Sequence, residues 1–187
     1  GNIEEIIYPY RSQLQNVNIP SSLSSRNVIV DFSQMFNKIE LILPPNLLTF
    51  TRQDSIANHT LIFSPGTRIL SNIPNWDGKL NLPLISTTSA TVPNSGSLEI
   101  MLNMGSITEL NLSSAAKIVI AGKAGKKAAW KKSSSASLIE ITTLCDSINS
   151  PGNINQNFPR ECYTNIGTDL IIFTYHLSDF AARKSPS

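Results

Sequence analysis

Hydrophobic and polar residues alternate over short stretches of this chain, and most stretches end at proline, glycine or asparagine. Side chains along a β-strand point to opposite faces in turn, so alternation over four to eight residues predicts strands with one buried face. The clearest examples are KIELIL (38–43) and SLIEITTL (137–144). The other predicted strands are 27–33, 47–51, 60–64, 80–86, 97–103, 116–121 and 169–175.

Turn-forming residues separate these strands at intervals of about ten residues, as is typical of all-β sandwiches. The turn signals are Pro44-Pro45, Pro65-Gly66, Asp77-Gly78, Asn94-Ser95-Gly96 and Pro151-Gly152. The only helical candidate, residues 3–14, is interrupted by Pro9, so an irregular arm or an edge strand is expected there. We therefore predict an all-β, antiparallel β-sandwich over residues 26–187, preceded by an arm and connector over residues 1–25.

Length and composition narrow the classes of function. A chain of 187 residues suits one domain, and 15% charged residues with a net charge of +2 leave no dense basic face for nucleic acid. No apolar run reaches the roughly 20 residues that span a bilayer. We interpret the chain as one domain of a larger protein, with any anchor or leader outside it.

The two cysteines, Cys145 and Cys162, flank a segment rich in proline, glycine and asparagine (SPGNINQNFPRE). An even cysteine count in a loop-rich domain indicates one disulfide and an oxidising compartment. The alternative is two unrelated buried thiols. Two N-glycosylation sequons, at Asn58 and Asn111, are compatible with secretion.

Residues 122–137 (GKAGKKAAWKKSSSAS) interrupt the alternation with five lysines around Trp130. We expect a solvated hairpin loop. Two alternatives are an anion-binding patch for an acidic glycan or a membrane surface, and Trp130 as a core anchor at the start of the next strand.

Conventional catalytic and cofactor sites are not indicated. The two histidines are far apart in sequence, which does not favour a metal site. The acidic residues are scattered, with Glu4-Glu5 the only adjacent pair, and indicate no two-carboxylate glycosidase site, and the sequence has no Gly-x-Ser-x-Gly elbow. We expect no cofactor. His59 lies within a sequon, and we expect it in a turn at the surface.

His176, Leu177 and Ser178 carry the candidate chemistry. In an extended strand His176 and Ser178 share one face, with the Leu177–Ser178 peptide between them. The Ser178 hydroxyl could attack the Leu177 carbonyl through a five-membered ring, with the imidazole taking its proton. Water would then hydrolyse the resulting ester. The structural alternative is a core strand with a hydrogen-bonded histidine.

A cysteine pair, a strand and then His176-Leu177-Ser178-Asp179-Phe180-Ala181 close this chain. This arrangement resembles the proteolysis-site (GPS) segment of the GPCR autoproteolysis-inducing (GAIN) domain, and related sandwich domains of surface proteins. The likeness covers residues 130–182, with the motif at 173–182.

The resemblance implies roles for individual residues. His176 would be the base, Ser178 the nucleophile and Leu177 the donor of the attacked carbonyl, while Cys145 and Cys162 would pair to hold a hairpin. Phe180 and Ala181 would begin a last strand that stays in the sandwich after cleavage.

Three hypotheses follow. The first is an extracellular or cell-surface GAIN-like domain that cleaves itself once, between Leu177 and Ser178, without turning over an external substrate. The second is the same sandwich uncleaved, as a structural or adhesion module. The third is a sandwich that binds a glycan or an anionic surface through residues 123–132. Expected partners are other domains of the same surface protein and an extracellular protein or glycan ligand.

Overall fold

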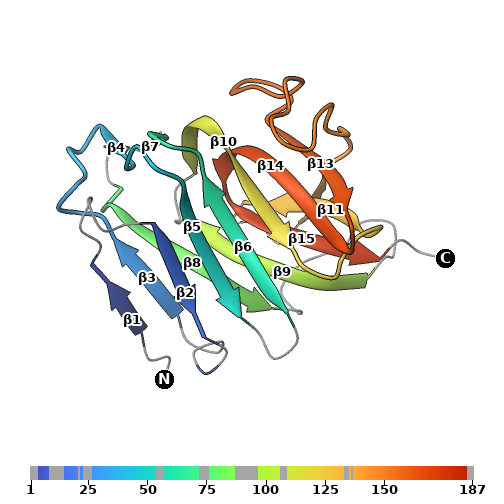
Figure 1. Ribbon diagram of the computed structural model, residues 1–187, viewed down its shortest axis with the longest axis horizontal. Helices are drawn as coiled ribbons and strands as arrows, with labels where there is room; N and C mark the ends of the chain where they lie inside the picture. Colours follow the sequence, from blue (N-terminus) through green and yellow to red (C-terminus); the bar gives the residue numbers. More distant parts are fainter. Residues whose placement is uncertain are drawn as a thin grey trace.

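The computed structural model describes residues 4–8, 15–20, 22, 27–53, 57–71, 76–86, 97–105, 109–132, 135 and 137–184. Within these ranges the chain is almost entirely β-structure and forms no α-helix. Two sheets pack face to face (Figure 1), which confirms the predicted β-sandwich.

The first sheet has seven strands. In spatial order they are β1 (Glu4–Ile7), β3 (Asn27–Asp31), β8 (Lys79–Ser86), β9 (Ser97–Gly105), β15 (Asp179–Lys184), β11 (Lys127–Lys131) and β12 (Ile139–Glu140). The last strand in sequence, β15, is therefore an interior strand, paired with β9 on one side and β11 on the other.

The second sheet has eight strands. Six follow one path: β13 (Glu161–Ile166), β14 (Asp169–Leu177), β10 (Leu110–Ile120), β6 (Asn58–Phe63), β5 (Leu48–Gln53) and β2 (Asn16–Ile19). In addition, β7 (Arg68–Ser71) pairs with the first part of β10, and β4 (Glu40–Ile42) pairs with β7. Since β10 contacts β7 and then β6, it bends between two partners while β14 runs along its other side.

Most neighbouring strands are antiparallel, as predicted, and the two N-terminal strands are the exceptions. β1 pairs with β3 and β2 with β5 in parallel, each at the outer edge of its sheet. The edge-strand alternative for the N-terminal segment thus describes the observed pairing.

The predicted strands all contain or overlap an observed one, but residues 137–144 contribute only the two-residue β12. The alternation pattern missed five strands: β2, β7, β11, β13 and β15, the last of which was expected only from the resemblance. The sequences of β11 (KAAWK) and β15 (DFAARK) do not alternate between apolar and polar residues, and three of their charged side chains, Lys131, Asp179 and Arg183, are buried. These charges form ion pairs with residues of other strands. A local sequence pattern does not reveal such pairs.

The expectation of a solvated loop over residues 122–137 is wrong for β11. Trp130 and Lys131 are buried, and the Lys131 ammonium lies 3.1 Å from the Asp179 carboxylate on β15. Lys123 and Lys126, in the turn before β11, lie 3.3 and 3.4 Å from the Glu99 carboxylate. Trp130 is a core anchor, as the alternative expected, because the indole joins the core between the two sheets, but it lies near the end of β11 and not at the start of the next strand.

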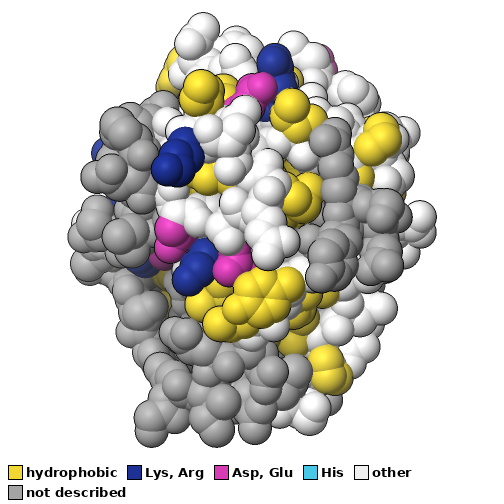
Figure 2. All heavy atoms as spheres, turned by 90° about the vertical axis from the view of Figure 1, so that its left-hand side faces the viewer, with side chains coloured by type: hydrophobic (Ala, Val, Ile, Leu, Met, Phe, Trp, Pro, Cys, Tyr) yellow, Lys and Arg dark blue, Asp and Glu magenta, His cyan; other side chains and the backbone are white. Residues whose placement is uncertain are grey.

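The surface reflects the low charge of the sequence. On the face that Figure 2 shows, acidic and basic side chains lie next to one another, and the described residues there form no patch of one sign. Among the described residues, no helix has the length and hydrophobicity needed to cross a membrane.

Cys145 and Cys162 form a disulfide, which confirms the predicted pairing. Cys162 lies in β13, and the segment around Leu144 pairs with Tyr163 in the parallel direction. The stapled segments therefore run side by side in the same direction, and the loop between them covers Ile171 and Phe173 on the outer face of β14.

Candidate functional site

The predicted motif lies where the chain passes from one sheet to the other. Leu177 ends β14 in the eight-stranded sheet, Asp179 begins β15 in the seven-stranded sheet, and Ser178 is the only residue between them. Both strands are paired on two sides. The Leu177–Ser178 peptide is thus a short link between two fixed elements.

His176 and Ser178 are brought together as their spacing predicts. The Ser178 Oγ atom lies 3.0 Å from His176 Nδ1, and both residues are buried. On the other side of the ring, His176 Nε2 lies 2.6 Å from Glu161 Oε2. A serine, a histidine and a carboxylate therefore form a continuous hydrogen-bonded chain.

This chain of hydrogen bonds determines which ring nitrogen can act as a base. A carboxylate only accepts hydrogen bonds, so the Nε2 atom that faces Glu161 carries a proton. The neutral imidazole then presents the lone pair of Nδ1 to the Ser178 hydroxyl. That is the tautomer needed to remove the proton from Ser178 Oγ.

Glu161 was not predicted from the sequence. In the β13–β14 hairpin Glu161 pairs directly with Thr174, so it lies diagonally across from His176, within reach of a long side chain. The signal that could have found it is the two-residue turn at Gly167-Thr168, because that turn fixes the register of the hairpin. Gly167 has a φ of +60°, as such a turn requires.

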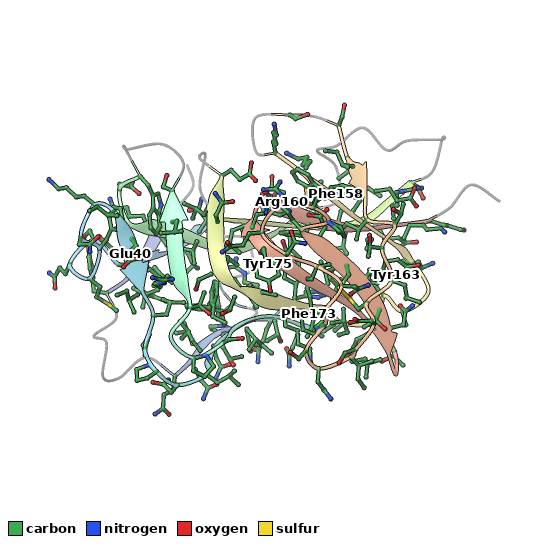
Figure 3. All side chains as sticks on the ribbon, turned by 90° about the horizontal axis from the view of Figure 1, so that it is seen from above. Glu40, Phe158, Arg160, Tyr163, Phe173 and Tyr175 are labelled. Carbon is green, nitrogen blue, oxygen red and sulfur yellow. A yellow bond between two sulfur atoms is a disulfide. The ribbon has the colours of Figure 1, made fainter. Side chains whose placement is uncertain are left out.

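Aromatic rings enclose the imidazole. The Trp130 ring lies edge-on at a centroid distance of 4.6 Å, and the Phe180 ring lies at 5.6 Å. The Arg160 guanidinium lies 5.8 Å from the centre of the Trp130 ring and forms an ion pair with Glu109. Figure 3 shows Arg160 beside Phe158, near the middle of the long axis of the molecule. The site is therefore apolar on the inside and bordered by charges at its rim.

A buried hydroxyl holds the backbone of His176. Thr174 Oγ1 donates to the His176 carbonyl at 2.8 Å and accepts from the His176 amide at 3.1 Å. The β10–β14 register shifts at this point, between the pairs Asn111–His176 and Ala116–Thr174. At such a bulge the backbone hydrogen bonds between the two strands are interrupted, and the Thr174 hydroxyl makes hydrogen bonds to the His176 backbone instead.

A buried ion pair follows the motif directly. Asp179 Oδ2 lies 3.1 Å from Lys131 Nζ, and Asp179 Oδ1 accepts from the Met104 amide at 3.2 Å. Burial raises the pKa of Asp179, and the hydrogen bonds from Lys131 and Met104 offset part of this increase.

Of the other predicted residues, Asn58 and His59 lie away from this centre, whereas Asn111 pairs in register with His176. Asn58 is exposed at the start of β6, whereas Asn111 is half-buried in β10 between β7 and β14. The expectation of a surface His59 is wrong. His59 is buried within β6, and its Nδ1 accepts from the Ala121 amide at 3.2 Å, because the sequon continues a strand instead of forming a turn.

The described part of the chain contains no group of three or more histidine, cysteine or acidic side chains suited to a metal ion. Comparison with protein-family models, with curated proteins and with solved structures found no match for this chain. The assignment of chemistry to the site thus depends on its geometry and on the motif.

Proposed function

We propose that this domain is an extracellular, GAIN-like sandwich of a cell-surface protein that cleaves its own chain between Leu177 and Ser178. The observation that carries the proposal is the hydrogen-bonded order Glu161, His176, Ser178, with distances of 2.6 and 3.0 Å. It supplies an oriented base beside a hydroxyl that is tethered to the peptide it would attack.

The first step converts the amide to an ester. Ser178 Oγ transfers its proton to His176 Nδ1 and forms a bond to the Leu177 carbonyl carbon, closing a five-membered ring. When the ring opens, the bond from that carbon to the Ser178 nitrogen breaks. The nitrogen takes the proton from the imidazolium and becomes a free amine. Glu161 stabilises the imidazolium that exists between the two proton transfers.

The second step is hydrolysis of the ester. A water molecule adds to the Leu177 carbonyl carbon and gives a proton to His176, and Ser178 Oγ leaves and recovers that proton. The products are a carboxyl group on Leu177 and a new N-terminus at Ser178. Because β15 keeps its pairing with β9 and β11, the short C-terminal fragment stays in the sheet without a covalent link.

The disulfide supports the proposed location. Cys145–Cys162 lies next to Glu161 in β13, and disulfides persist in oxidising compartments such as the cell exterior. The partners of such a domain are the neighbouring domains of its own surface protein.

Mass spectrometry under denaturing conditions tests the proposal. Cleavage yields a separate fragment of residues 178–187, and hydroxylamine, which attacks esters, increases its yield by releasing Leu177 as a hydroxamate. Ser178→Ala abolishes the fragment, Ser178→Thr retains it, and His176→Ala slows its formation by about 10²–10⁴-fold.

An intact full-length mass, unchanged by hydroxylamine, contradicts self-cleavage. The sandwich is then the non-cleaving structural or adhesion module, in which the same three side chains form a hydrogen-bond network between the half-buried Glu161 and the buried His176 and Ser178. A fragment that still forms in Ser178→Ala would point to an external protease.

A further inference from the structure

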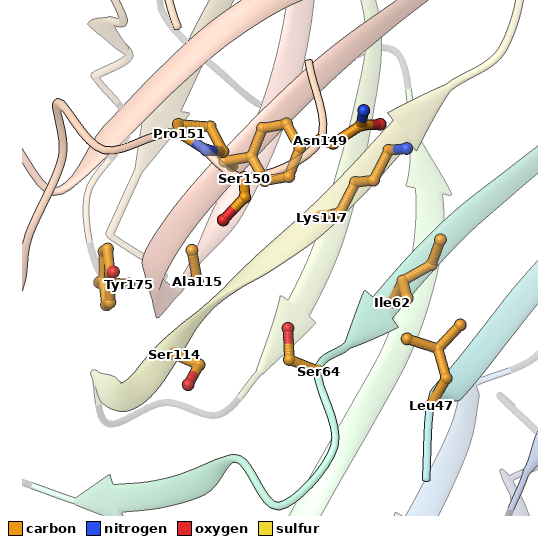
Figure 4. A pocket seen from close by; sticks show the side chains of 11 residues that line it. Leu47, Ile62, Ser64, Ser114, Ala115, Lys117, Asn149, Ser150, Pro151 and Tyr175 are labelled. Carbon is orange, nitrogen blue, oxygen red and sulfur yellow. The ribbon is translucent and has the colours of Figure 1, made fainter. Parts of the chain in front are cut away.

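The back of the catalytic strand carries a groove. Phe173 and Tyr175 alternate along β14 with Thr174 and His176, so their side chains lie on the outer face of the eight-stranded sheet. Together with β6, β10 and the tip of the stapled loop they enclose a hollow of about 340 Å³ (Figure 4). That volume lies within the range of small-ligand sites, which begins at about 300 Å³.

Polar side chains without a hydrogen-bond partner in the described part of the protein line this groove. Figure 4 shows the hydroxyls of Ser64, Ser114 and Ser150 around it, with Asn149 and Lys117 close together at one side. Within the described residues, none of these side chains makes a hydrogen bond or ion pair with the rest of the protein. Polar groups that the protein leaves unpaired are available to a ligand.

Lys117 gives the groove its charge. Its ammonium lies 6.0 Å from the centre of the Phe173 ring, and the described part of the chain places no carboxylate within 4.0 Å of it. One cation beside hydroxyl and amide groups suits a single carboxylate. A phosphate group is typically held by an arginine fork or several backbone amides, and the groove lining contains no arginine.

The floor of the groove argues for a sugar and against a peptide strand. β6, β10 and β14 are each paired on both sides, so their backbone groups are unavailable for adding a strand. A pyranose ring instead offers one apolar face for the half-buried Tyr175 ring and several hydroxyls for the serines and Asn149.

We infer that this groove binds an acidic pyranose residue of a glycan, with Lys117 holding the carboxylate. The inference does not depend on self-cleavage, because none of the groove residues takes part in it.

The binding test uses the whole chain and two acidic probes, methyl β-D-glucuronide and methyl α-N-acetylneuraminide. Amide chemical shifts in NMR spectra are followed during titration, with methyl β-D-glucoside and acetate as comparison ligands. We expect at least one acidic sugar to shift amides of β6, β10 and β14, and to bind more tightly than either comparison ligand.

Two lysine variants make the test specific. Lys117→Met keeps the aliphatic stem over Phe173 and removes the charge, so the affinity for the acidic sugar falls by about tenfold. Lys127→Met removes the same charge from an exposed position on the other sheet and leaves the affinity unchanged.

Three results would overturn the inference: neither acidic sugar binds, acetate binds as tightly as the sugars, or the shifted amides lie outside the groove. The mass spectrum of the same sample records whether the Leu177–Ser178 bond is cut, so the two proposals fail separately.

Discussion

Glu161 lies diagonally across from His176 on the neighbouring strand, and its Oε2 atom is 2.6 Å from His176 Nε2. The pair is held by a two-stranded hairpin whose edge strand also carries the disulfide at Cys162. An imidazole with one nitrogen engaged in this way has a defined tautomer and little rotational freedom. The geometry makes Glu161 a positioning residue for the proposed cleavage.

Replacing Glu161 therefore slows cleavage without removing the nucleophile. In Glu161→Ala, His176 Nε2 loses its acceptor, so the ring can turn or adopt the other tautomer, and the rate falls by about tenfold or more. Glu161→Gln retains a carbonyl acceptor but no charge, and its rate lies between those of Glu161→Ala and the unmodified protein. The measurement is the time course of fragment formation after cell-free synthesis.

Glu99→Gln is the matched control, because Glu99 pairs with Lys123 and Lys126 at the surface, away from His176. Its rate should equal that of the unmodified protein. Cleavage of Glu161→Ala at the unmodified rate, with the variant folded, would show that His176 needs no oriented partner.

The buried pair of Asp179 and Lys131 is a separate source of conformational stability. Removing one partner leaves a buried charge without its counterion, so Lys131→Met and Asp179→Asn each lower the free energy of unfolding by about 3–5 kcal/mol. The double variant Asp179→Leu, Lys131→Met recovers much of this loss, because an apolar pair of similar volume carries no desolvation penalty. Denaturant unfolding curves give these values.

The surface pair of Lys126 and Glu99 serves as the comparison, since an exposed pair contributes about 0–1 kcal/mol. If Lys131→Met lowered the free energy of unfolding no more than Lys126→Met does, the pair of Lys131 and Asp179 would behave as a solvent-exposed pair, and the prediction would be wrong.

The contributions of Asp179 and Glu99 to the free energy of unfolding should change with pH in opposite directions. Burial raises the pKa of Asp179 above its ordinary 3.8, so the pH-dependent part of its contribution to stability is present below 3.8 and is lost as the pH rises through the folded-state pKa. The hydrogen bond from Lys123 lowers the pKa of Glu99 below its ordinary 4.5, so its contribution is present above 4.5 and is lost as the pH falls through the folded-state pKa.

Unfolding free energies between about pH 3 and pH 7 test both signs. The stability of the unmodified protein relative to Asp179→Asn should decrease as the pH rises above 3.8. Relative to Glu99→Gln it should decrease as the pH falls below 4.5. If the free energy difference changed with pH in the same direction in both comparisons, burial would not be the main influence on the pKa of Asp179.

Local patterns in the sequence predicted the sandwich and the shared face of His176 and Ser178. Alternation identifies strands such as β5, whose residues are buried and half-buried in turn. Spacing by two residues is likewise a local property. Glu161 depends on the register between two strands, and the interior position of β15 depends on how Asp179 and Arg183 pair with Lys131 and Glu140. Contacts between strands of this kind cannot be predicted from the pattern of residues that are neighbours in the sequence.

Thr174 illustrates the same point and leads to the last prediction. Its hydroxyl makes two hydrogen bonds to the backbone of His176 where the β10–β14 ladder is interrupted. Thr174→Val keeps the shape of the side chain but leaves a buried amide and a buried carbonyl without this partner, at a cost of about 1–3 kcal/mol of stability. Because the affected backbone belongs to the base itself, cleavage should also slow. Thr174→Ser restores the hydroxyl and should recover both stability and cleavage rate, as measured by denaturant unfolding and fragment formation. If Thr174→Val lost stability while cleaving at the unmodified rate, the hydroxyl would support the strand without positioning His176.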